Sequence, residues 1–138
     1  MVDMTLWENY RKVCFIAPFS PPDWPDYAIV TAWNPGSQPV GRRRNTRRQH
    51  ALLRVIHRFG TLPAMGPVWG SALDENWQEE SWLLRASRLD ATRLAAAFGQ
   101  YALYRVERGE LWLEPALLNV PPCYLGPLAA HWIVRAPT

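Results

Sequence analysis

The feature that most constrains how this chain folds is the segment over residues 42–58, where apolar side chains recur at helical spacing. Leu52, Ile56 and Phe59 lie three or four residues apart, so they share one side of a helix. Gly60 follows this pattern and is typical of the residue just beyond a helix C-terminus. The sequence therefore predicts a helix over about 42–58 with its apolar side buried.

The same segment carries charge of only one sign. Seven arginines lie between Arg42 and Arg58, and no acidic residue lies between Asp26 and Asp74. Such a region repels itself unless an anionic group lies nearby, either on another part of the protein or on a ligand. The net charge of the whole chain is only +3, so charge alone does not imply non-specific binding to nucleic acid.

Two elements are predicted before this helix. A capping box over Thr5–Glu8 and the helical spacing of the apolar residues up to Ile16 predict an N-terminal helix that ends before Pro18. A proline-rich connector over 18–25 follows. Residues 27–33 are β-branched and aromatic, which predicts a buried strand that stops at Asn34-Pro35-Gly36.

The elements predicted after it define the fold class. They are a short strand within 61–73, a strand over 81–87, a helix over 91–98 with Asp90 as its N-cap and Gly99 beyond its end, a hairpin of 101–106 with 110–113, and a last strand over 131–134. The order β-α-β-β-α-β-β predicts an α+β fold, a mainly antiparallel sheet with two main helices packed on one face, in addition to the N-terminal helix. A chain of 138 residues fits a single domain, residues 1–138.

Polar side chains extend the buried side of the 42–58 helix toward its N-terminus. Continuing the apolar pattern backward by threes and fours gives Gln49, Arg48 and Asn45. The strand that ends at Trp33-Asn34 should deliver its turn to the same place, and a helix N-terminus favours anions. Two interpretations stay open: these amides bind a ligand, or they tie the loop to the helix as mimics of the backbone.

Other candidate residues follow later in the chain. Four acids lie in the segment 74–80, and three interpretations of them stay open. They belong to a solvated loop, or they provide a counter-charge for the arginines, or one of them, Glu80 beside Ser81, acts as a general acid/base. Ser81 lacks the glycine-rich elbow of a serine nucleophile. Gln100, which follows the 91–98 helix, either caps that turn or reaches into the same cleft.

Several classes of function are not indicated. Cys14 and Cys123 are far apart and the three histidines are scattered, so the sequence predicts no metal site. No apolar run reaches the roughly 18 to 20 residues of a membrane span, and the N-terminus has no signal-peptide pattern. We therefore expect a cytoplasmic protein with no membrane partner and no cofactor. Eight tryptophans predict an aromatic-rich core, with one or two rings lining a pocket or a contact surface.

Taken together, these segments resemble an uncharacterised bacterial family catalogued as domain of unknown function three-two-nine-three. The resemblance covers roughly residues 27–106 and rests on Thr31-Ala-Trp-Asn-Pro35, on Asn45 with Arg48, Gln49 and Leu52, on Glu80-Ser81, and on Phe98-Gly99-Gln100 with Ala102. The family usually has Glu-Pro-Ser where this chain has Glu79-Glu80-Ser81, so the match of the acidic residue is open by one position. The family has no established activity, and the resemblance implies a shared site rather than a function.

The favoured functional hypothesis is a binding module for a small anionic or nucleotide-like ligand in a polar cleft. Its predicted contacts are Trp33 as a stacking platform, Asn34, Asn45, Arg48, Gln49, Ser81 and Gln100. Whether the protein is also an enzyme stays open, with Glu80 as the only catalytic candidate.

Two alternatives use other surfaces of the chain. One is nucleic-acid binding through the outward side of the arginine-rich helix, with Arg42, Arg43, Arg44, Arg47 and Arg58 as contacts. The other is a regulatory module whose aromatic surface docks a protein partner. Salt dependence separates the first alternative from a pocket ligand, because binding to a phosphate backbone weakens steeply as ionic strength rises.

Overall fold

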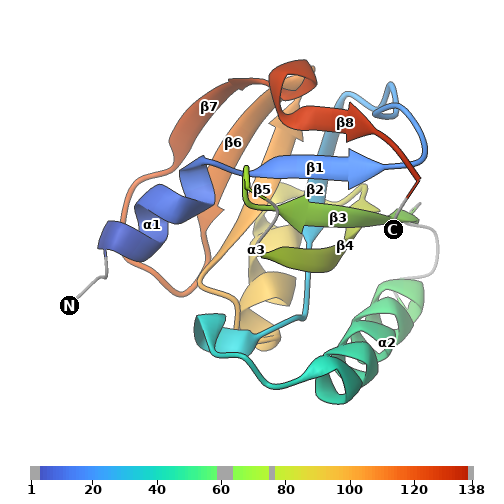
Figure 1. The fold of residues 1–138 in the computed structure, drawn as a ribbon, viewed down its shortest axis with the longest axis vertical. Coiled ribbons are helices and arrows are strands. Elements are labelled where there is room, and N and C mark those ends of the chain that lie inside the picture. Colours follow the sequence, from blue (N-terminus) through green and yellow to red (C-terminus); the bar gives the residue numbers. More distant parts are fainter. Residues whose placement is uncertain (1–3, 59–63, 75–76, 137–138) are drawn as a thin grey trace.

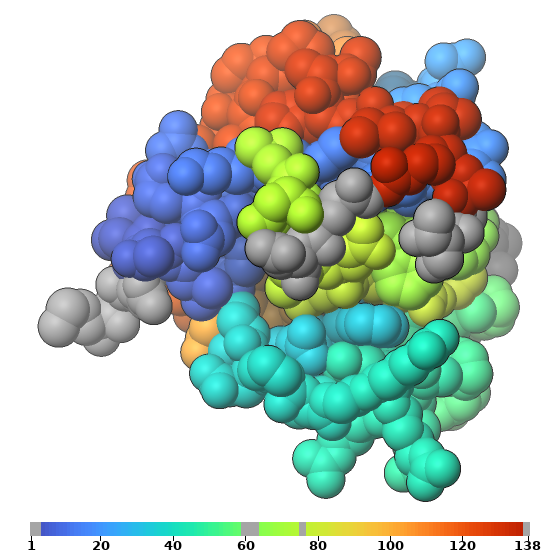
Figure 2. Space-filling model, viewed as in Figure 1, coloured from blue at the N-terminus to red at the C-terminus, as the bar shows by residue number. Residues whose placement is uncertain are grey.

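A computed structural model, which describes residues 4–58, 64–74 and 77–136, has an α+β fold, as predicted. Its strands are β1 (Cys14–Ala17), β2 (Asp26–Val30), β3 (Ala64–Ser71), β4 (Gln78–Leu84), β5 (Ala102–Glu107), β6 (Glu110–Pro115), β7 (Cys123–Pro127) and β8 (Trp132–Val134). Its helices are α1 (Met4–Arg11), α2 (Arg42–Arg58) and α3 (Arg88–Ala97), and the short 3-10 helices are η1 (Pro35–Ser37) and η2 (Leu128–His131). None of the described helices is long and apolar enough to cross a membrane. Figure 1 shows the arrangement, and α2 forms one rim of the molecule in Figure 2.

The strands form one sheet that curls on itself. Its order is β7-β6-β5-β2-β4-β3-β1-β8, and the paired strands of the described residues are antiparallel except for β1 with β8, which are parallel. Three strands separate β1 from β5, which would put them roughly 19 Å apart in a flat sheet. The ring of Phe15 on β1 nevertheless lies 5.1 Å from the ring of Tyr104 on β5. The sheet must therefore curl to bring these side chains together across its interior.

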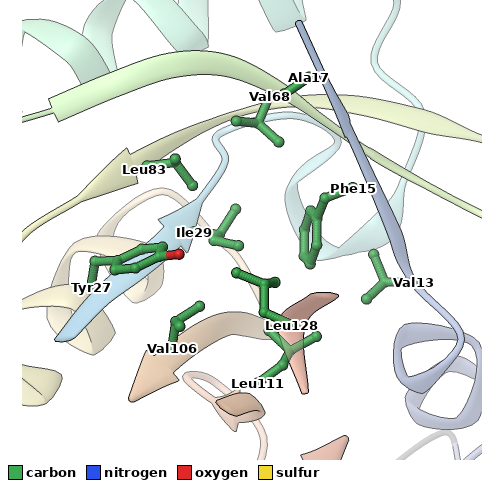
Figure 3. Close-up of a cluster of buried hydrophobic side chains, with 10 residues drawn as sticks. All are labelled: Val13, Phe15, Ala17, Tyr27, Ile29, Val68, Leu83, Val106, Leu111 and Leu128. Atoms are coloured by element: carbon green, nitrogen blue, oxygen red, sulfur yellow. The ribbon is translucent and has the colours of Figure 1, made fainter. Parts of the chain in front are cut away.

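Each face of the curled sheet has its own hydrophobic core. The inner core joins buried side chains of β1 to β6 and η2, as Figure 3 shows: Val13, Phe15, Ala17, Tyr27, Ile29, Val68, Leu83, Val106, Leu111 and Leu128. The outer core joins α2 and α3 to β2, β4 and β5 through Ala28, Val30, Ala32, Leu52, Ile56, Leu84, Ala91, Leu94, Ala95 and Leu103. The two main helices thus pack on one face of the sheet.

Helix α2 spans the predicted range, and its buried residues are Asn45, Gln49, Leu52 and Ile56. The predicted role of Gly60 falls outside the described residues. Helix α3 begins earlier than predicted: its N-cap is Ser87, whose side chain accepts from the Asp90 backbone N–H, so Asp90 lies in the first turn.

The prediction of one N-terminal helix as far as Ile16 was wrong. Helix α1 ends at Arg11, its range already includes the expected cap Thr5, and Cys14–Ala17 form β1. Val13, Phe15 and Ala17 are every second residue, and their side chains lie in the inner core, as in a strand. The prediction was wrong because the apolar residues of this segment also fit a helical spacing. Strand β2 ends three residues before Trp33, and β7 was not predicted.

One histidine connects the start of β1 to β7, near the two ends of the sheet. His131 at the end of η2 places Nδ1 2.9 Å from the Val13 carbonyl oxygen and Nε2 2.9 Å from the Leu125 carbonyl oxygen. A carbonyl oxygen only accepts a hydrogen bond. The tautomer of the ring therefore decides which nitrogen carries a proton and donates to the carbonyl that it faces. Val13 and Leu125 are far apart in sequence, and this side chain therefore helps to close the curled sheet.

Replacing His131 by alanine should lower the free energy of unfolding by about 1 to 3 kcal/mol, because carbonyl groups of two segments lose their partner. Urea unfolding of His131→Ala measures the change. His57→Ala is the matched control, since His57 is exposed on α2 and should change stability by less than about 0.5 kcal/mol. Equal stability of the two variants would contradict the role in closure.

Candidate functional site

The loop that follows β2 is held against α2 by a pair of amides. Asn45 Oδ1 accepts from the Asn34 backbone N–H at 2.8 Å, and Asn45 Nδ2 donates to Asn34 Oδ1 at 2.8 Å. This pair, the Asn34–Asn45 clasp, fixes Asn34 in the left-handed backbone region with φ of 45°. Asparagine tolerates that conformation better than other non-glycine residues, so its place here suits both the backbone and the side chain.

Three further predicted ligand residues also bind backbone groups around this loop. Gln49 Oε1 accepts from the Ala32 N–H at 3.0 Å, and Arg48 Nε donates to the Ala32 carbonyl at 2.7 Å. Arg48 Nη2 also donates to the Phe98 carbonyl, and Gln100 Nε2 donates to the Trp33 carbonyl at 2.9 Å. These contacts are those of the structural tie between loop and helix, the second of the two interpretations that the sequence left open.

The clasp leaves one donor of Asn34 for a carboxylate in the interior. Asn34 Nδ2 lies 3.2 Å from Glu79 Oε1, and Glu79 is buried. Side chains alternate along β4, so Glu79 shares the inner face with Ser81 and Leu83. Glu80 points to the opposite face, toward α2, where burial raises the pKa of its carboxyl and His50 lowers it. The carboxyl group at this place is therefore that of Glu79 and not that of the predicted Glu80.

Glu79 faces a small enclosed space, the inner cavity, at one end of the inner core. Water-sized centres can occupy about 40 Å³ of it, enough for one to a few waters. Its walls come from the ends of β1 to β5, the loop after β2, η1, α1 and Trp77, and its lining includes Tyr10, Phe15, Ile29, Thr31, Asn34, Ser37, Trp77, Glu79, Ser81, Gln100 and Tyr104. The cavity thus combines apolar side chains with hydroxyl and amide groups, and Glu79 is the one carboxyl group in its lining.

The surroundings of Glu79 raise the pKa of its carboxyl from 4.5 to about 7. Burial is the main cause, because it removes the water that would solvate the charge, and hydrogen bonds from Asn34 and Trp77 oppose it. Near neutral pH this group is present in both protonation states. It can accept from an N–H donor or a cation when ionised, and it can exchange a proton with a bound molecule.

A larger open space, the vestibule, adjoins the inner cavity. It has a volume of about 540 Å³, and its lining residues are Leu6, Asn9, Tyr10, Lys12, Ser37, Ala72, Leu73, Asp74 and Trp77. Tyr10, Ser37 and Trp77 line both spaces, so they form the boundary between them. The Tyr10 hydroxyl and the Ser37 hydroxyl are hydrogen-bonded, and Tyr104 Oη donates to the Tyr10 carbonyl at 2.6 Å. These bonds hold α1 against the entrance.

The structure divides the predicted ligand residues into two groups. Asn34, Ser81 and Gln100 line the inner cavity, and the others do not. Asn45, Arg48 and Gln49 serve the loop backbone, and Trp33 packs edge-on against Trp69 with ring centroids 5.7 Å apart. The arginines predicted for nucleic acid (Arg42, Arg43, Arg44, Arg47 and Arg58) are all exposed on α2.

Sequence reasoning missed the central carboxyl group. Glu79, Ser81 and Leu83 alternate, and this period of two was the signal that could have selected Glu79 over Glu80. The family pattern Glu-Pro-Ser, placed on Glu79-Glu80-Ser81, also puts its glutamate at position 79. No sequence pattern indicates Trp77 or Tyr10, because only the folded chain brings these two residues to the cavity. Among the described residues, no three His, Cys, Asp or Glu side chains come together as a group that could hold a metal ion.

Comparison with known proteins identifies a family without an assigned function. The family model described as "Protein of unknown function (DUF3293)" matches residues 30–103, more than half of the chain. It is the family that the sequence motifs resembled. No curated protein matches the chain, and no solved structure matches it. The matched range includes the clasp, Glu79 and Gln100 but neither Tyr10 nor Tyr104.

Replacing Asn45 by alanine should destabilise the protein by about 2 to 4 kcal/mol, because the Asn34 N–H loses its partner and the Asn34 side-chain oxygen loses its closest donor. Thr46→Ala is the matched control one residue away on the exposed side of α2, with an expected change below about 0.5 kcal/mol. Chemical unfolding measures both. A stable Asn45→Ala protein would mean that the clasp is dispensable.

The raised pKa of Glu79 should make stability fall as pH rises. The folded protein binds this proton more tightly than the unfolded chain, so the free energy of unfolding decreases between about pH 4.5 and about pH 7, by up to about 3 kcal/mol. Glu79→Gln removes this contribution and should be the more stable protein at about pH 8. Unfolding at several pH values compares the two, and identical pH profiles would refute the assignment.

Proposed function

The chain belongs to the DUF3293 family, and we propose that it binds a small molecule whose N–H donor or cationic end reaches Glu79 in the inner cavity. The observation that carries the proposal is one buried carboxyl group, held by Asn34 at the inner end of a cavity that adjoins a roomy vestibule. A few oriented polar groups beside apolar and aromatic side chains are the usual arrangement of a small-molecule site, and Glu79 is the carboxyl group among them here.

The contacts of Arg48 favour a ligand with donors over an anion. The sequence suggested an anionic ligand because Arg48 and the helix N-terminus were expected to meet in one cleft. In the folded protein the guanidinium donates to the carbonyls of Ala32 and Phe98, which occupies donors that an anion would need. A phosphate or carboxylate in the inner cavity would instead lie beside ionised Glu79 and be repelled by it.

The vestibule favours an aromatic or apolar body on the same ligand. Its lining includes Leu6, Leu73, Tyr10 and Trp77, with Lys12 also present. Flat rings stack well on tyrosine and tryptophan. A nucleotide-like molecule stays compatible with this site when an N–H edge of its base faces Glu79 and its phosphate lies near Lys12.

Three probes with the same ring but different head groups test the charge preference: benzamidine, benzyl alcohol and benzoate. Ligand-observed NMR should detect benzamidine most strongly and benzoate least. Affinity for benzamidine should rise about tenfold between about pH 6 and about pH 8, because Glu79 ionises around pH 7 and only the ionised form attracts the cation.

Neighbouring carboxyl groups provide the matched variants for this experiment. Glu79→Gln should abolish the preference for benzamidine together with its pH dependence. Glu80→Gln should leave both unchanged, because Glu80 lies on the opposite face of β4. Stronger binding of benzoate, or an unaffected Glu79→Gln protein, would disprove the proposed ligand class.

A further inference from the structure

A second surface of the protein, on the outer side of α2, carries an unusual density of positive charge. At about 100° per residue, Arg43, Arg47, Arg54 and Arg58 fall within roughly 60° of the helix circumference. All four are exposed, and we refer to them as the arginine stripe. Figure 2 shows side chains of α2 projecting from the rim of the molecule.

The buried side of the helix fixes where the arginine stripe points. Asn45, Gln49, Leu52 and Ile56 are buried and lie on the opposite side of α2. Asn45 is bound to Asn34, and Gln49 is bound to Ala32, so the helix cannot rotate without breaking both contacts. The stripe therefore faces away from the body of the protein.

The described part of the chain offers these arginines no ion-pair partner. The ion pairs among the described residues involve Arg11, Arg88 and Arg105, which lie outside α2. Of the nearby acids, Glu79 faces the inner cavity and Asp74 lines the vestibule. Glu80 lies on the side of β4 that faces α2, and its charge interacts with His50 rather than with the stripe. Among the described residues, no ion pair therefore offsets the repulsion along the stripe, and a partner with repeated negative charges would relieve it.

We propose that the arginine stripe binds the phosphate backbone of duplex nucleic acid. A helix of 17 residues is about 25 Å long, which corresponds to the rise of about seven base pairs. Arginines four residues apart stand about 6 Å apart along the helix, so each can contact its own phosphate. Such contacts position a protein on the duplex without reading its sequence.

The composition of the outer side of α2 favours nucleic acid over a membrane surface. A helix that binds a membrane surface inserts an apolar side among the lipids. The apolar residues Leu52 and Ile56 of α2 are buried in the outer core, and none of the large exposed apolar residues lies on this helix. The outer side of α2 therefore offers a partner the charges of its arginines, as expected for contacts with phosphates.

Fluorescence anisotropy with a labelled DNA duplex of about 20 base pairs tests the proposal. Affinity should fall about a hundredfold between about 50 mM and about 200 mM NaCl if four phosphates are neutralised. A triple variant of the stripe, Arg43→Gln, Arg47→Gln and Arg54→Gln, should bind at least tenfold more weakly at the lower salt concentration. Its melting temperature should match that of the parent protein, because all three side chains are exposed.

A control of equal net charge separates the stripe from a general effect of charge. Arg85, Arg93 and Arg108 are exposed outside α2, and their triple glutamine variant should keep its affinity within about twofold. An equal loss in this control, binding that is insensitive to salt, or no binding at low salt would each overturn the proposal. So would binding to vesicles of phosphatidylcholine and phosphatidylserine without binding to the duplex. An RNA duplex of the same sequence should compete with the DNA, because the contacts are to phosphates.

Discussion

The rest of the site depends on the paired hydrogen bonds between Asn34 and Asn45. They hold the end of β2 against the first turns of α2, and they use both polar atoms of the Asn45 side chain. With its oxygen and backbone N–H engaged, Asn34 can direct only its remaining donor inward, to Glu79. One contact between two amides therefore sets the position of the helix and the orientation of the cavity's central group.

The two sides of β4 show how a sheet with two cores can keep two functions apart. Glu79 and Glu80 are adjacent in sequence but face different environments, because successive side chains of a strand point to opposite faces. The inner face ends in a cavity where a carboxyl group loses solvation, and this raises its pKa. The outer face supports α2, whose far side carries the arginine stripe. The proposed ligand and the proposed nucleic acid would thus occupy opposite sides of one structural layer.

The sequence predicted the parts of this structure that local patterns control. The range of α2 and the inward side of Asn45 and Gln49 follow from helical periodicity alone. Strand β1 could not be recognised, because four residues are too few to distinguish a period of two from a helical pattern beside them. For the site, the sequence identified the residues near the clasp but left two roles open, a structural tie and ligand binding, and the contacts seen are those of the tie. Amide side chains bind backbone and ligand groups equally well, and only the fold decides which of these is within reach.

The range shared with the family is also smaller than the sheet that builds the site. Residues 30–103 include β3 and β4, but β1, which pairs with β3, and β2 up to Ile29, which pairs with β4, lie outside the range. A fragment cut at these limits would expose unpaired backbone groups along two strand edges, where other chains can add and aggregate. It would also lack Phe15 and Tyr104, which line the cavity. The segment that matches the family is therefore shorter than the segment that supplies the strand pairs of the sheet and the lining of the cavity.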